Sequence, residues 1–157
     1  MEYFQIADLF GQRPKPKLEL YLEPTGKIGP IPYDQVPHRF FWLGLTNTGR
    51  GLAKFPGARF KRAECSLNVF PYGLDGNGNY GLPLRVSDND WVIFRGGVDD
   101  VIYPGTTLKI TQCVQRYSRG DPRKGVGIFD SFTFTAEVSC EALPTIPVER
   151  IVPEGRN

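Results

Sequence analysis

Hydrophobic residues recur at every second position in several separate stretches of this chain, and that period is typical of β-strands with one buried face. The clearest stretch runs from residue 131 to 141 (SFTFTAEVSCE), where apolar and polar residues alternate without a break. It predicts a core strand whose inner face is formed by Phe132, Phe134, Ala136, Val138 and Cys140.

The stretch from residue 39 to 45 (RFFWLGL) is apolar on both of its alternating faces. A strand that is covered on both sides has this composition, so the pattern predicts a central strand rather than an edge strand. Asn47, Gly49 and Gly51 then interrupt the pattern and predict a turn.

Six further strands are predicted between clusters of glycine, proline and asparagine. They cover residues 18–22, 58–70, 82–86, 91–94, 106–115 and 148–152. The strand at 82–86 contains a proline and is therefore predicted near an edge of its sheet. The inward residues of the second are Ala63, Cys65, Leu67 and Val69. In the fifth, Leu108, Ile110 and Val114 share one face and Cys113 lies on the other. Residues 26–37, which hold three prolines, are predicted as a long extended loop.

No long helical pattern separates these strands, which favours antiparallel pairing. The prediction is therefore an all-β fold, an immunoglobulin-like antiparallel β-sandwich of about seven or eight strands, with a closed barrel as the alternative. A length of 157 residues suggests one domain. We divide it into a short helix and linker at 1–15, the sandwich at 16–143, and an extended proline-rich tail at 144–157 that holds the last predicted strand, an edge strand.

Residues 1–12 (MEYFQIADLFGQ) predict a short amphipathic helix, which Gly11 and Pro14 end. A helix of this length is marginal alone, so we expect it to pack on another surface. Its large apolar residues are the candidate interaction residues, Tyr3, Phe4, Ile6, Leu9 and Phe10. Packing on its own sandwich is one outcome. Because Pro14 and Pro16 hold the linker semi-extended, we favour the other, in which the helix docks on a protein partner, an upstream domain or a second copy of the chain.

Charge and cysteine content narrow the class of protein. A net charge of +2 gives no indication of a dedicated nucleic-acid binder. There is no basic region followed by a long apolar run at the N-terminus, and no apolar run approaches the ~20 residues of a membrane span, so we expect a cytoplasmic protein and no membrane partner. The three widely separated cysteines, Cys65, Cys113 and Cys140, predict reduced, buried thiols.

Catalytic, cofactor and metal sites are not indicated. His38 is the only histidine, and it is interpreted as a solvated or capping residue. Asp75, Asn77 and Asn79 have the spacing of a calcium loop, but Tyr80 stands where such a loop needs glycine. The cluster therefore predicts a hairpin turn. A weak calcium site stays open as the alternative, because other carboxylates follow at Asp88, Asp90, Asp99 and Asp100.

Two basic stretches are candidates for contact with phosphate. The first is a loop with an aromatic residue, formed by Arg116, Tyr117, Arg119, Arg123 and Lys124. The second holds Arg59, Lys61 and Arg62. Basic groups next to an aromatic ring can bind a single strand through phosphate contacts and base stacking. A solvated surface is the other interpretation and the preferred one.

Two short groups of residues resemble known bacterial modules. Asn47-Thr48-Gly49 and Ala53, with Tyr103-Pro104-Gly105 before the strand at 106–115, resemble bacterial immunoglobulin-like modules of the cell-adhesion-related kind. Residues 6–14 (IADLFGQRP), followed by Pro16-Lys17-Leu18, are similar to the carboxy-terminal accessory region of bacterial proteins with a Schlafen-type AlbA DNA-binding domain. The resemblance implies an accessory sandwich that mediates contacts within or between proteins. DNA binding does not follow from it, because the AlbA domain is not part of this sequence.

The function expected from these patterns is that of a non-catalytic protein-interaction module in a bacterial cytoplasmic protein, able to dock a partner, an upstream domain or its own copy. A nucleic-acid-binding accessory domain that uses the basic loops is the first alternative. An enzyme of an unrecognised kind is the second.

Overall fold

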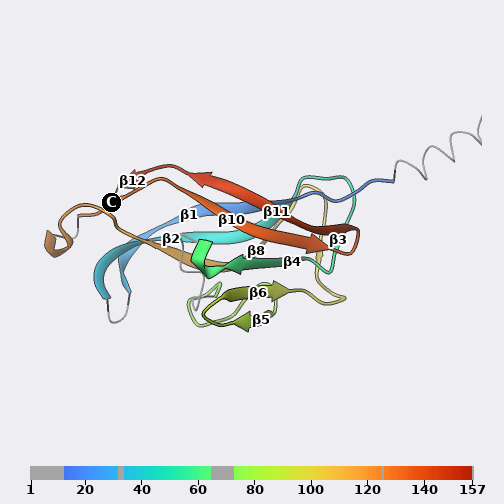
Figure 1. The fold of residues 1–157 in the computed structure, drawn as a ribbon, viewed down its shortest axis with the longest axis horizontal. Helices are drawn as coiled ribbons and strands as arrows, with labels where there is room; N and C mark the ends of the chain where they lie inside the picture. Colours follow the sequence, from blue (N-terminus) through green and yellow to red (C-terminus); the bar gives the residue numbers. More distant parts are fainter. Residues whose placement is uncertain (1–12, 32–33, 65–72, 125, 157) are drawn as a thin grey trace, which may run out of the picture.

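The computed structural model describes residues 13–31, 34–64, 73–124 and 126–156, and this part of the chain is all-β with antiparallel pairing throughout (Figure 1). One sheet has the order β1-β2-β8, and its strands are β1 (Leu18–Ile31), β2 (Asp34–Asn47) and β8 (Thr107–Arg116). The second has the order β11-β10-β4-β6-β5. Its strands are β11 (Leu143–Val152), β10 (Phe132–Cys140), β4 (Gly57–Lys61), β6 (Trp91–Arg95) and β5 (Leu84–Ser87).

Two short ribbons and two single-turn helices complete the described elements. The ribbons pair β12 (Gly155–Arg156) with β9 (Ile128–Phe129), and β3 (Ala53–Lys54) with β7 (Val101–Ile102). The 3₁₀ turns are η1 (Arg62–Glu64) and η2 (Pro122–Lys124). Among the described residues, no helix has the length and apolarity that a membrane crossing requires. The helix predicted at residues 1–12 lies outside the described residues.

One apolar core joins the two larger sheets. Phe41 of β2 meets Phe132 of β10 edge to face, with ring centroids 6.1 Å apart. Within the five-stranded sheet, Phe134 lies 5.3 Å from Phe60. Buried residues of both sheets belong to the same cluster, among them Leu20, Leu43, Ile110, Phe94 and Val138. The hydrophobic effect therefore holds the sheets against each other, an arrangement that fits a β-sandwich.

The two strongest strand predictions are confirmed. In β10, Phe134, Ala136, Val138 and Cys140 are all buried, and the strand lies between β11 and β4. Strand β2 lies between β1 and β8, as expected of a central strand. The short strand at 82–86 was expected near an edge, and β5 is the edge of its sheet.

The hairpin between β1 and β2 is longer than predicted. Residues 26–37 were expected to form a loop, but β1 continues to Ile31 and β2 begins at Asp34. Pro24 is tolerated inside β1 because β1 is an edge strand, where a missing backbone N–H need not break a ladder. The pairing is irregular between Pro24 and Ile28, so the sequence pattern shows no clean alternation there.

The strand predicted at 58–70 is too long. Strand β4 ends at Lys61, and Ala63, expected to face inward, is exposed in η1. The turn is held by Arg62, whose backbone N–H donates to Asp90 O at 2.9 Å and whose Nε donates to Asp88 O. The other residues predicted to face inward from this strand, Cys65, Leu67 and Val69, lie outside the described residues.

The predicted phase of β8 is wrong in its second half. Its pairing with β2 shifts by one residue between Leu43 and Gly44, which inserts a bulge. Cys113 therefore joins Ile110 in the shared core instead of facing away from it. Val114 is turned to the opposite face, where it lies across from Phe40 of β2. A side chain at Gly44 would come within 2.4 Å of the Leu108 carbonyl oxygen, so the bulge also explains this glycine.

The C-terminal part of the chain belongs to the sheet more fully than predicted. Strand β11 begins at Leu143, five residues before the predicted edge strand, and it pairs along β10 from Leu143 to Val152. Three prolines near this segment are compatible with pairing because β11 is an edge of its sheet. The residues after it form β12, which pairs with β9.

Selective alkylation tests the cysteine prediction. Cys113 and Cys140 are both buried and neither forms a disulfide in the described part of the chain. Burial raises the pKa of the Cys140 thiol, which lowers the fraction of reactive thiolate. We expect iodoacetamide to modify both positions readily in denatured, unreduced protein and only slowly in native protein, as measured by peptide mass spectrometry. Equal rates in the two states would contradict their burial.

Candidate functional site

Two of the four cations in the first predicted basic stretch are paired with carboxylates. Arg119 pairs with Glu154 at 2.7 Å and with Asp130 at 3.1 Å, and Arg123 lies 3.5 Å from Asp121. The loop stands at the same end of the molecule as the C-terminus, whereas β4, which carries Arg59 and Lys61, lies in the middle of its sheet (Figure 1). The structure therefore does not join the two basic stretches into one phosphate-binding surface.

The other candidate residues have structural roles. His38 is buried at 3% exposure with Nδ1 2.6 Å from the Val36 carbonyl oxygen, so a solvated histidine was the wrong interpretation. Asp75 accepts a hydrogen bond from the Asn77 backbone N–H at 2.8 Å, and this bond holds the pKa of Asp75 below its usual value. Within the described ranges, no group of three metal-binding side chains is found. The hydrogen bonds of Asp75 support the predicted turn at this position.

Arg39 is a buried cation that the sequence analysis did not single out. Its guanidinium lies over the rings of Phe41 and Phe129, at 4.7 and 5.2 Å from their centroids. Its Nη2 donates to Gln115 Oε1 at 2.7 Å, and burial lowers its pKa. A side chain at Gly155 would overlap the guanidinium, so β12 packs directly on it. Arg39 thus fixes the C-terminal ribbon and is not open to a ligand.

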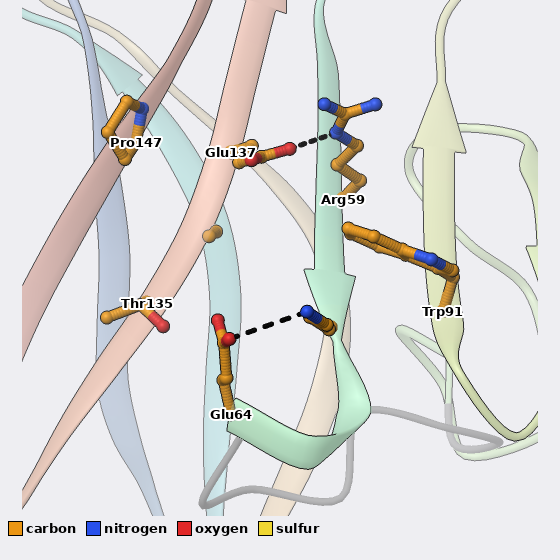
Figure 2. A pocket seen from close by; sticks show the side chains of 8 residues that line it. Arg59, Glu64, Trp91, Thr135, Glu137 and Pro147 are labelled. Atoms are coloured by element: carbon orange, nitrogen blue, oxygen red, sulfur yellow. Dashed lines mark hydrogen bonds and ion pairs between the residues drawn. The ribbon is translucent and has the colours of Figure 1, made fainter.

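A shallow groove of about 420 Å³ runs over the five-stranded sheet (Figure 2). Most of its side chains come from strand positions that alternate with the core residues, while Glu64 lies in η1 and Ala136 is itself a core residue. Glu137 lies opposite Arg59 on β4 and opposite Pro147 on β11, while Lys61 lies opposite Trp91 on β6. Strand pairing thus brings together residues that are far apart in the sequence.

The charges of this groove cancel. Arg59 Nε donates to a Glu137 carboxylate oxygen, and its guanidinium lies 5.4 Å from the Trp91 ring centroid. Lys61 Nζ lies 3.7 Å from Glu64 Oε1. Such exposed ion pairs contribute little to stability and leave no excess positive charge for phosphate. Two of the three cations of the second basic stretch are therefore also paired with carboxylates, while Arg62 donates to Asp88 O and Ser87 Oγ.

Several exposed apolar side chains lie at the ribbon of β3 and β7, interrupted by the exposed Lys54, and we call this group the end patch. It consists of Leu52, Phe55, Val98 and Tyr103, four of the six large hydrophobic side chains that are exposed in the described part. They lie on or beside the ribbon of β3 and β7. The other face of this ribbon, Ala53 and Ile102, is buried in the core. The ribbon is thus anchored by one face and offers the other to solvent.

The end patch is held rigidly. Phe55 has φ of 51°, the only positive value of a non-glycine residue among those described. The backbone on both sides is fixed, because Lys54 O accepts from Glu141 N and Pro56 O accepts from Gly96 N, both at 2.8 Å. The turn that carries Val98 is closed by Asp100, whose Oδ2 accepts from Gly97 N at 2.7 Å.

The sequence pattern did not reveal the end patch. Its residues are scattered among turn residues, and each strand of the ribbon has only two residues, which is too short for a period to be visible. The only local signal is a group of bulky apolar residues between glycines, and that signal is common in loops. The groove was missed for a different reason, since its members come from four separate segments.

No known protein family matches this chain, and no curated protein matches it either.

Proposed function

We propose that this domain is a non-catalytic protein-interaction module of a bacterial cytoplasmic protein, with an immunoglobulin-like sandwich as its scaffold and the end patch as its contact surface. The observation that carries the proposal is the positive φ of the exposed Phe55. A bulky side chain in the left-handed region costs roughly 1–2 kcal/mol, yet Phe55 is 42% exposed and buries only part of its apolar surface. Strain of this kind is typical of residues that serve a contact.

The surroundings of Phe55 support the same proposal. Val98 and Tyr103 are 75% and 61% exposed, so the end patch presents several large apolar groups at once. Clusters of exposed apolar residues on a soluble domain mark contact sites more often than single ones do. Rigid presentation reduces the conformational entropy lost on binding, which favours association.

The alternatives receive less support. A nucleic-acid interface needs uncompensated basic groups, whereas Arg59, Lys61, Arg119 and Arg123 all have carboxylate partners. For an enzyme, the described residues offer a single histidine, which is buried against a backbone carbonyl. The exposed apolar side chains of the end patch, by contrast, have no partner in the described part of the fold of the kind that these basic groups have.

Polar substitution of the end patch tests the proposal. We expect the full chain to self-associate with rising concentration in light scattering, and a Leu52→Ser/Phe55→Asn/Tyr103→Ser variant to remain monomeric. Asparagine is chosen at position 55 because it tolerates positive φ, so the melting temperature should change little. The matched control is Val126→Ser/Ile151→Ser, which removes two exposed apolar residues elsewhere. Identical association of all three proteins would contradict the proposal.

A further inference from the structure

The end patch lies where the chain enters the sandwich. The backbone N–H groups of Arg50 and Gly51 donate to Lys15 O at 3.1 and 3.2 Å, and Thr48 N donates to Lys17 O at 2.8 Å. Residues 13–17 therefore run antiparallel along the turn that leads into Leu52. Side chains at Gly49 or Gly51 would collide with this backbone, so the close approach is built into the sequence. The residues that precede Arg13 consequently start beside the end patch.

The chemistry of those preceding residues complements the end patch. Residues 2–10 carry five large apolar side chains and the two carboxylates of Glu2 and Asp8, with no lysine or arginine. The rim of the end patch carries exposed cations at Lys15, Arg50 and Lys54, together with acidic residues at Asp99, Asp100 and Glu141. The apolar segment and the apolar patch attract each other by burial, and the carboxylates of the segment match the cations on the Lys15 side of the patch.

The direction of the chain before β1 and the area of the contact favour a second copy as the source of the segment. Residues 13–17 run outward beyond the end of the domain in Figure 1, held semi-extended by Pro14 and Pro16. Four patch residues alone cannot supply the ~800 Å² per partner of a typical specific interface. Five more large side chains, at roughly 150 Å² each, bring each of two symmetric contacts into that range.

Resting on the proposed function, we infer that residues 2–10 of one chain dock on the end patch of a second copy, in a reciprocal two-fold exchange. The contact pairs the apolar residues of the segment with Leu52, Phe55 and Tyr103. Glu2 and Asp8 lie against Lys15, Arg50 or Lys54 of the other chain. Exchange of an identical element between two copies is a common route to symmetric dimers.

Complementation between two full-length variants tests the exchange. One variant, Phe4→Ser/Phe10→Ser, keeps the patch and loses the segment. The other, Leu52→Ser/Phe55→Asn/Tyr103→Ser, keeps the segment and loses the patch. Each is expected to be monomeric alone, while their mixture forms a dimer through one intact contact, at least tenfold weaker than the wild-type dimer. A mixture that stays monomeric at concentrations a hundredfold above the wild-type dissociation constant would overturn the exchange.

Cross-linking separates failure of the inference from failure of the proposed function. Carbodiimide joins carboxylates to amines in direct contact, and a mixture of ¹⁴N- and ¹⁵N-labelled full chains distinguishes links between chains from links within one. We expect links from Glu2 or Asp8 to Lys15 or Lys54 between chains, and their loss in the patch variant. Links only within one chain, or none, would overturn the exchange. If the patch variant still abolished association in that case, the end patch would remain the contact surface, but something other than residues 2–10 of a second copy would bind it.

Discussion

Replacement of Phe134 by alanine is expected to lower the free energy of unfolding by about 3–5 kcal/mol. Phe134 is fully buried on β10, and its ring lies 5.3 Å from that of Phe60 on the neighbouring strand β4. Truncation removes the transfer free energy of the ring and leaves a cavity that close-packed neighbours fill only partly. Urea unfolding followed by circular dichroism measures the change.

The matched control for Phe134 is Ile151→Ala on the adjacent strand β11. Ile151 is 71% exposed, so its truncation is expected to change the stability by no more than about 0.5 kcal/mol. A Phe134→Ala protein whose unfolding curve matches that of the control would show that β10 does not face the core. The inward assignment of the whole alternating strand would then fail with it.

Asn47 is the second position with a large expected effect. Its side chain is fully buried at the end of β2 and forms hydrogen bonds with four backbone groups in three segments. Oδ1 accepts from Lys17 N at 3.2 Å and from Gly49 N at 3.0 Å, and Nδ2 donates to Gly51 O at 2.7 Å and to Ile102 O at 2.9 Å. Asn47→Ala is expected to cost roughly 3–5 kcal/mol, because four backbone groups lose a partner at about 1 kcal/mol or more each.

Two further variants control this experiment. Thr48→Ala, at the adjacent exposed position, is expected to change the stability by no more than about 0.5 kcal/mol. Asn47→Asp keeps Oδ1 and places a second acceptor against the carbonyls of Gly51 and Ile102. Its loss of stability relative to wild type is expected to be larger at pH 7 than at pH 5, since burial and the facing carbonyl oxygens raise the pKa of the new carboxyl, which regains its proton as pH falls. An Asn47→Ala protein as stable as Thr48→Ala would exclude the proposed role of these hydrogen bonds.

The resemblance to immunoglobulin-like modules rested partly on the Asn47-Thr48-Gly49 turn and the Tyr103-Pro104-Gly105 turn. In the structure these turns meet, because Gly105 N donates to Asn47 O at 2.8 Å and the Asn47 side chain reaches Ile102. The two motifs thus form one structural unit at the end of the molecule that carries the end patch. Nothing in the sequence pattern indicated that they touch.

Local sequence patterns were sufficient to predict a strand and its buried face wherever that strand was regular. The alternation in β10 and the two apolar faces of β2 were visible in the sequence, because side chains alternate across a strand whatever the strand pairs with. The all-β class and the burial of Cys140 followed from the same period. The turn at Asp75 followed from side-chain chemistry that acts over two or three residues.

Pairing between distant strands decided the rest. The bulge opposite Gly44 reversed the phase of Cys113, and the hydrogen bonds of Arg62 with the turn at Asp88 and Asp90 ended β4 at Lys61. Both depend on the partner strand, so no local period records them. The end patch has the same origin: Leu52 and Phe55 join Tyr103 and Val98 only because β3 pairs with β7 across about fifty residues of chain. The sequence by itself determined where the regular strands lie, while the tertiary structure decided where the irregular strands begin and end, which faces meet and which apolar groups stay exposed, because register is a property of two segments and not of one.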